Sequence, residues 1–255
     1  MRNLVAGFLL AFILSNVVIA GPILWVGDNS GTLGTVDVDT GNVNVIGSMG
    51  VTMTDIAFDP SGNLYGVTFS ALYSINKVTG STTQIGSLGG ASVNSLVFDS
   101  AGNLYAANNS LYTINVATGA ATVVGTGGSY SSSGDLAFIG GELFLSSVGD
   151  SLFKLDTLTG IGTLVGAIGS SAVYGLATDN NIDLYGLTST TVLSINTATG
   201  AGSALVNYGG QGLNAAWGSA FLSEAGGGTI PEPATLALLS LGLVGIGFAR
   251  KKKQS

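Results

Sequence analysis

Asp55-Ile-Ala-Phe-Asp-Pro-Ser-Gly-Asn-Leu-Tyr65, followed by Leu72-Tyr-Ser-Ile-Asn-Lys-Val-Thr-Gly80, is the stretch that decides the fold of this chain. The pattern returns as Ser95-Leu-Val-Phe-Asp-Ser-Ala-Gly-Asn-Leu-Tyr105 with Leu111-Tyr-Thr-Ile-Asn-Val-Ala-Thr-Gly119, and in looser form over 135–160 and 175–200. The Thr-Gly pair that closes each copy recurs with spacings of 39, 39, 41 and 40 residues, starting at Thr40, Thr79, Thr118, Thr159 and Thr199. A fixed period near 40 residues is the signature of a repeat architecture.

Each repeat unit reads as four short strands. Residues alternate in the strand period, with Leu72, Ser74 and Asn76 on one side and Tyr73 and Ile75 on the other. Turns are predicted at Asp-Pro-Ser-Gly-Asn and at Asn-Lys-Val-Thr-Gly. Gly accepts positive φ, and the side chain of Asp or Asn forms hydrogen bonds with the nearby backbone. We predict strands at 56–58, 64–68, 72–76 and 82–85. Four strands in about 40 residues are typical of one β-propeller blade.

The two ends of the repeat region indicate ring closure. The first unit starts at Leu24-Trp25-Val26, which aligns with Leu64-Tyr65-Gly66 and so lacks an opening strand. Leu213-Asn-Ala-Ala-Trp217 matches the opening strand of the other units in type. We therefore predict an all-β, five-bladed propeller of four-stranded blades, closed by a C-terminal strand. Two alternatives stay open: a sixth, partial blade that begins at Ala220-Phe221-Leu222, and an open β-solenoid or sandwich.

The pattern Asp-x-x-Gly-Asn-Leu-Tyr after a short apolar strand resembles the blades of NHL and gluconolactonase-like propellers. The resemblance spans most of 24–222 and rests on turn residues.

The N-terminus is predicted to be a secretory signal peptide over 1–20. Arg2 supplies a basic start, Leu4 to Leu14 an apolar run, and Val18-Ile19-Ala20 the small or β-branched residues that precede cleavage. The alternative is an uncleaved membrane anchor. We assign 21–223 to the propeller and 224–230 to a Gly-rich linker.

The C-terminus contains three parts in order: Pro231-Glu232-Pro233, an apolar stretch, and the basic cluster Arg250, Lys251, Lys252 and Lys253. This arrangement over 231–255 resembles the PEP-CTERM sorting signal, which is read by an exosortase, a membrane protease-transpeptidase of Gram-negative bacteria that make exopolysaccharide. The resemblance implies cleavage near Glu232. As a helix, residues 234–249 would be about 24 Å long, short for a bilayer core of about 30 Å. We predict a transient transmembrane helix whose basic end stays in the cytoplasm; a permanent single-pass anchor is the alternative.

Composition excludes several classes of function. Between the two ends the chain has two lysines against eleven aspartates and two glutamates, a formal charge of −11, which disfavours nucleic acid and anionic lipid as partners. There is no Cys and no His, so a disulfide framework, a Ser-His-Asp triad and a histidine-ligated zinc site are all impossible. We expect no cofactor and no resident metal; only a hard cation such as calcium would suit the oxygen ligands present.

The remaining candidates for chemistry are carboxylates. Asp55 and Asp135 stand at the head of the first strand of non-adjacent blades, where Ser95, Gly175 and Asn214 occupy the equivalent positions. Asp55, Asp135 and Asn214 are therefore candidates to meet at one mouth of the central channel, as ligand-binding groups, an acid/base pair or calcium ligands. We favour the alternative, that they cap turns and are solvated. The turn sequences 59–63, 99–103 and 179–183 contain calcium-type residues but are too short for an EF-hand loop, so we assign them to tight turns.

The tyrosines that recur from blade to blade, at 65, 73, 105, 112, 174 and 185, suit either sugar stacking or packing between blades, and we favour packing. The sequence as a whole predicts an exported, non-enzymatic propeller of the cell surface or exopolysaccharide matrix that binds a glycan or a protein. Its predicted processing partners are signal peptidase and an exosortase. The alternatives are a carboxylate-dependent polysaccharide hydrolase or lyase and, more weakly, an ice- or surface-binding protein.

Overall fold

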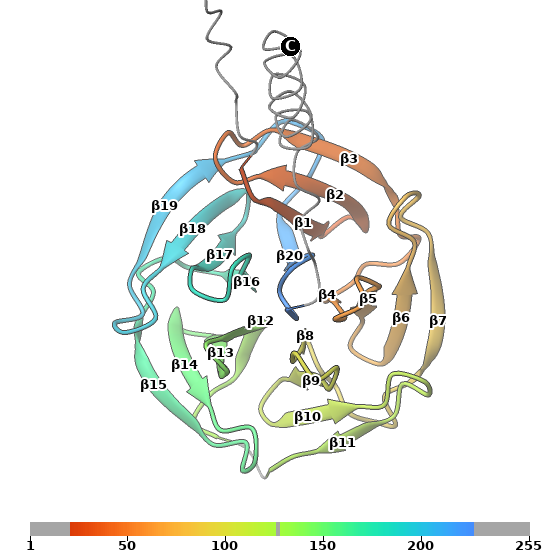
Figure 1. Cartoon of the computed structure of the whole chain (residues 1–255), viewed down its shortest axis with the longest axis vertical. Helices are drawn as coiled ribbons and strands as arrows, with labels where there is room; N and C mark the ends of the chain where they lie inside the picture. Colours follow the sequence, from red (N-terminus) through yellow and green to blue (C-terminus); the bar gives the residue numbers. More distant parts are fainter. Residues whose placement is uncertain (1–20, 126–127, 227–255) are drawn as a thin grey trace, which may run out of the picture.

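The computed structural model describes residues 21–125 and 128–226. The predicted signal peptide (1–20), the sorting motif Pro231, Glu232 and Pro233, the apolar stretch 234–249 and the basic cluster 250–253 lie outside the described residues. Within the described part, twenty strands form five four-stranded antiparallel sheets arranged in a ring (Figure 1), which confirms the predicted five-bladed propeller. This part of the chain contains no helix with the length and apolar character needed to cross a bilayer.

The second blade is formed by the repeat 55–80 and the strand that follows it. Its four strands begin and end within two residues of the predicted limits. The inner strand of every blade is followed by three strands that lie successively further from the axis of the ring (Figure 1). The blades, in chain order from the second, are β4 (Asp55–Phe58), β5 (Leu64–Val67), β6 (Ala71–Ile75), β7 (Thr82–Ser87); β8 (Ser95–Phe98), β9 (Leu104–Ala107), β10 (Leu111–Ile114), β11 (Ala121–Val123); β12 (Ser132–Ile139), β13 (Glu142–Ser147), β14 (Ser151–Leu155), β15 (Gly162–Ala167); and β16 (Val173–Ala177), β17 (Leu184–Thr188), β18 (Thr191–Ile195), β19 (Gly202–Asn207).

The first blade is completed by the last strand, as predicted. β20 (Ala216–Phe221) pairs antiparallel with β1 (Ile23–Asp28), and β2 (Thr32–Asp37) and β3 (Val43–Ser48) follow outward. The closing strand lies three to four residues later than the predicted 213–217. Ala220 and Phe221 belong to this strand, so the described chain has no sixth blade.

The position of Phe221 explains this register. Phe221 pairs with Leu24 just as Phe58 pairs with Leu64, and its ring lies 5.2 Å from that of Tyr185 in the neighbouring blade. The same contact joins Tyr65 to Phe98, at 5.3 Å. Such aromatic pairs contribute about 0.5–1.5 kcal/mol beyond the area they bury. The recurrent Tyr65, Tyr105 and Tyr185 therefore pack between blades, as we favoured.

The hydrophobic core consists of five clusters, each between two adjacent blades. One cluster joins the last complete blade to the first, through Leu187 and Val192 on one side and Leu24 and Val26 on the other. The other four clusters follow the same plan around the ring. Because a blade buries its apolar faces only against its neighbours, the closing strand stabilises the ring as a whole.

The recurrent Thr-Gly pair also serves contacts between blades. Gly80 lies at φ +79°, a conformation that L side chains rarely adopt. The turn of one blade abuts the outer strand of the preceding blade so closely that a Cβ on Gly86 would overlap the carbonyl oxygen of Thr118. The motif thus marks both a turn and a backbone contact that leaves no room for a side chain.

Strand direction gives the ring two different faces. The turn face bears the turns after each inner strand and the Thr-Gly turns, whereas the loop face bears the inner hairpin loops, such as 68–70, and the connections between blades, such as 88–94. β1 starts and β20 ends at the turn face, so both ends of the described chain lie there. Nine of the thirteen acidic residues and both lysines also belong to the turn face: Asp37, Asp39, Asp59, Asp99, Glu142, Asp156, Asp179, Asp183 and Glu224, with Lys77 and Lys154.

Candidate functional site

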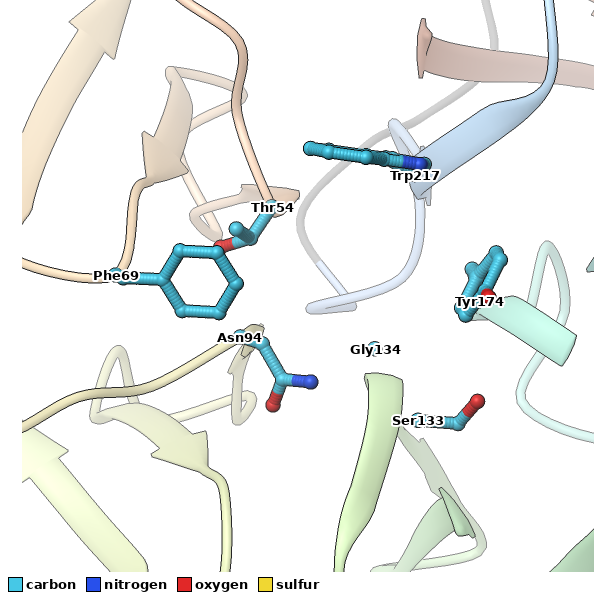
Figure 2. A pocket seen from close by; sticks show the side chains of 7 residues that line it. All are labelled: Thr54, Phe69, Asn94, Ser133, Gly134, Tyr174 and Trp217. Atoms are coloured by element: carbon cyan, nitrogen blue, oxygen red, sulfur yellow. The ribbon is translucent and has the colours of Figure 1, made fainter. Parts of the chain in front are cut away.

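A pocket opens at the centre of the loop face. Its lining comes from all five blades, and most of it consists of the residue directly before the head position of each inner strand. Figure 2 shows these side chains around a common centre: Thr54, Phe69, Asn94, Ser133, Gly134, Tyr174 and Trp217. We call this site the mouth pocket. Because each blade contributes one such position, the repeat itself builds the ring of lining residues.

The mouth pocket is small and mostly apolar. Its volume is about 170 Å³, below the roughly 300–1,000 Å³ of pockets that enclose drug-sized ligands. Three of its side chains are aromatic: Trp217, Tyr174 and Phe69, the last of which is 54% exposed. A site of this size accommodates a single ring or side chain rather than a whole oligomer.

The polar groups of the mouth pocket are uncharged. Asn94 Nδ2 donates a hydrogen bond of 3.0 Å to the carbonyl oxygen of Ser132, whereas Asn94 Oδ1 has no partner among the described residues. Thr54 Oγ1 donates to the carbonyl oxygen of Val67 at 3.0 Å and retains acceptor capacity. A buried acceptor without a partner is costly, about 1–3 kcal/mol.

Asp55 and Asp135 lie beneath the mouth pocket, with no exposed surface. Each carboxylate bridges two blades: Asp55 accepts from the backbone N–H of Ile56 at 2.7 Å and of Leu96 in the next blade at 2.6 Å. Asp135 repeats this with Leu136 and Leu176, both at 2.6 Å, and also accepts from Ser219 Oγ at 3.1 Å. The two carboxylates therefore join adjacent inner strands, and neither of our expectations, a solvated cap or an open channel-mouth ligand, describes them.

The two carboxyl groups are brought together and share a side-chain hydrogen bond. Burial raises the pKa of both Asp55 and Asp135 well above the ordinary value. The nearby Asp135 raises the pKa of Asp55 further, whereas the hydrogen bonds that Asp135 accepts from Leu176, Leu136 and Ser219 act to lower its own pKa. We call the two residues the carboxyl pair. Its hydrogen bonds to four backbone amides give it a structural role in the innermost part of the ring.

Asn214 does not belong to this group. Strand pairing places Gly218, not Asn214, at the position of Asp55, because β20 begins later than predicted. The side chain of Asn214 is exposed, and its backbone N–H donates to Asp28 Oδ2 at 2.9 Å. A carboxylate at position 218 would be impossible, since even a Cβ there would lie 2.5 Å from the Cα of Asp55.

The turn after β20 covers the ring axis at the opposite, turn face. Glu224 is 8% exposed and Ala225 2% exposed, so both belong to the propeller, which extends past the boundary we expected at 223. Burial, and then the charge of Asp135, raise the pKa of Glu224 well above its usual range. The burial of Glu224 was not expected, because Glu-Ala followed by three glycines is typical of a linker.

The calcium-type turns form hydrogen bonds with their own backbone. Asp59 Oδ1 accepts from the N–H groups of Ser61 and Asn63, at 2.9 and 2.8 Å, and Asp99 repeats the arrangement. Across residues 21–125 and 128–226, no group of three or more acidic side chains is placed to hold a metal ion.

The C-terminal tail is similar to a known sorting signal. Residues 229–252 match the PEP-CTERM protein-sorting motif. The match contains Pro231, Glu232 and Pro233, the apolar stretch, and the basic cluster as far as Lys252. This sorting signal implies that the protein is exported with a membrane-anchored tail and processed by an exosortase. No curated protein matches the chain.

Solved structures bear on the fold alone. A structure from work on the de novo evolutionary emergence of a symmetrical protein shares 18% identity, with a TM-score of 0.54, over 76% of this chain and 96% of that one. A chain of the nidogen–laminin complex shares 12% identity, with a TM-score of 0.55, over 78% of this chain and 98% of that one.

Proposed function

We propose that the exported propeller is a non-enzymatic glycan-binding protein of the cell surface or exopolysaccharide matrix of a Gram-negative bacterium. The mouth pocket holds one uncharged sugar ring at the end or a branch of a polysaccharide. The observation that carries the proposal is the combination of Trp217, Tyr174 and Phe69 with the uncharged polar side chains of Thr54 and Asn94 around one small site.

The chemistry of a sugar ring fits these groups. Its C–H face packs against aromatic rings, and its hydroxyl groups exchange hydrogen bonds with uncharged polar side chains such as those of Thr54 and Asn94. A neutral sugar is favoured over an acidic one because the pocket lacks a basic side chain and lies above the two carboxyls of the carboxyl pair. The pocket volume suits one ring.

The burial of Asp55 and Asp135 supports a binding role over hydrolysis. A catalytic acid or base must come within hydrogen-bond reach of the substrate. Both carboxyls have no exposed surface and are already hydrogen-bonded to two backbone amides each.

Titration of the purified propeller with neutral and acidic oligosaccharides tests the proposal, with intrinsic fluorescence as the readout. Trp217 is one of only two tryptophans, so a Trp25→Phe background isolates its emission. We expect saturable changes with a neutral oligosaccharide, at least tenfold weaker binding in Asn94→Ala, which corresponds to about 1.4 kcal/mol, and unchanged binding in Val148→Ala. Val148 is 61% exposed on the same face but is not part of the pocket.

Two results would contradict the proposal. One is binding that is indifferent to Asn94→Ala and to Trp217→Ala, measured by calorimetry because the second variant loses the fluorescent reporter. The other is release of reducing sugar by the wild-type protein that Asp55→Asn abolishes, which would establish the hydrolase alternative. If no oligosaccharide binds but an envelope protein does so through Trp217, the ligand is a protein.

A further inference from the structure

The end of the described chain is fixed on the turn face. After β20, Ser223 Oγ donates a 2.6 Å hydrogen bond to the carbonyl oxygen of Asp179, while Ala225 is buried between the second and third blades. Gly226 lies beside Ser100 in an inner turn of the third blade. The sorting signal therefore leaves the propeller from an inner position on the turn face, opposite the mouth pocket.

The chain from this point to the membrane is short. Only eight residue steps separate Gly226 from Ala234, where the apolar stretch begins, and eight extended residues reach at most about 26–29 Å. To place the loop face against the membrane, the tail would have to pass the outer strands of a blade, about 10 Å, and then cross the height of a six-residue strand, about 20 Å. That path consumes the full reach of the tail.

The two faces also differ in charge. The turn face has nine acidic residues and two lysines, whereas Asp150 is the only acidic residue of the loop face that has exposed surface in the described chain. An acidic face is repelled by anionic lipid over about a Debye length, roughly 8 Å at physiological ionic strength. This repulsion opposes close contact between the turn face and an anionic bilayer, so the orientation rests on the exit point and the tether length and not on charge.

We propose that the sorting signal orients the propeller, with the acidic turn face toward the membrane and the mouth pocket facing outward. The mouth pocket is then open to a polymer outside the cell while the protein is still anchored. The orientation follows from the exit point and the tether length, so it holds whether or not the ligand is a glycan.

Energy transfer from single-cysteine labels to the membrane tests this orientation. The chain has no native cysteine, so each label is unique. Full-length protein is purified without an exosortase and inserted into preformed phosphatidylcholine vesicles. Four variants each carry one labelled cysteine, and they are compared in two pairs. Val78→Cys is compared with Ser70→Cys in the second blade, and Leu158→Cys with Val148→Cys in the fourth. Val78 and Leu158, 84% and 85% exposed, lie on the turn face, and their partners lie on the loop face.

In both blades we expect transfer to a headgroup-attached acceptor to be about twofold or more higher from the turn-face label, because the faces are about 20 Å apart. A flexible 20-residue insertion after Gly228 should remove most of this difference. Equal or reversed transfer would overturn the proposal, and so would a difference that survives the insertion unchanged. No glycan is present, so the result is independent of the proposed ligand.

Discussion

Asp55 and Asp135 are 80 positions apart in the sequence, yet their carboxyl groups are hydrogen-bonded to each other in the innermost part of the ring. Each stands at the head of an inner strand and accepts the backbone N–H of the strand next to it. The carboxyl pair thus connects four inner strands, β4, β8, β12 and β16, and Ser219 adds the fifth, β20. Its first consequences concern stability.

Substitution of Asp55 by alanine should destabilise the propeller strongly. The N–H groups of Ile56 and Leu96 would lose their acceptor in a buried site, at a cost of about 1–3 kcal/mol each. Urea unfolding followed by circular dichroism measures the loss. Glu142→Gln is the matched control, because its ion pair with Lys154 is exposed and contributes about 0–1 kcal/mol. Equal midpoints for the two variants would contradict the bridging role of Asp55.

Stability should fall as pH rises above about 4, the pKa of aspartate in an unfolded chain. Burial raises the folded-state pKa of Asp55, Asp135 and Glu224, so the folded state retains protons that the unfolded state releases. The stabilisation is complete below the unfolded pKa and is lost as pH rises through the folded pKa. Unfolding in urea at about pH 5 and pH 8 measures this slope, and we expect Asp55→Asn to reduce it. A slope of opposite sign would show that the carboxyls are ionised when folded.

Gly86→Ala should destabilise more than Gly102→Ala. A Cβ at position 86 meets the backbone of Thr118 in the next blade, whereas position 102 opens to free space. The loss of stability in Gly102→Ala then comes only from the φ of +85° at this position, which costs an alanine about 1–2 kcal/mol. Thermal unfolding of the two variants compares a contact between blades with local strain. A smaller effect at Gly86 would mean that adjacent blades do not depend on this close approach.

Phe221→Ala should weaken closure of the ring. Phe221 is 2% exposed and packs on Tyr185 in the cluster that joins the last complete blade to the first. Truncation of a buried Phe costs about 3–5 kcal/mol. Limited proteolysis should then cut within the first blade sooner than in wild type. Phe69→Ala, an exposed aromatic on the loop face, is the control and should leave the cleavage rate unchanged.

Glu232→Ala should block processing of the sorting signal. Pro231 and Pro233 restrict the backbone on either side of Glu232 to extended conformations, which suit entry into a protease site. We expect the variant to remain full-length in the inner membrane of an exosortase-bearing host, whereas the wild-type protein ends near Glu232. Mass spectrometry of surface protein decides this. Wild-type surface protein that still contains Lys251 would establish a permanent anchor.

The same mass spectrometry tests the N-terminal prediction. Removal of 1–20 should leave Gly21 as the first residue of the exported protein, and an N-terminus at Met1 would indicate an uncleaved anchor.

The local sequence alone determined the repeat. The alternation of residues determines the strands, and Gly at positive-φ turns such as Gly80 marks the turn positions. The spacing of the Thr-Gly pairs determines the blade count. All three features depend on neighbours along the chain. The C-terminal sorting signal could likewise be predicted from the sequence, because Pro-Glu-Pro, an apolar stretch and a basic cluster occur in order.

Only the tertiary structure decided the site. That Asp55 and Asp135 would be buried bridges rather than open ligands depends on how tightly five inner strands converge, which no single repeat encodes. The register of β20 depended on Phe221 meeting Tyr185 across the closure, so Gly218 rather than Asn214 reached the inner ring. Thr54, Asn94, Tyr174 and Trp217 occupy the same position of different repeats but differ in residue type, so no shared motif marks them in the sequence. They form one pocket because rotation around the ring axis brings one position from every blade to the same centre.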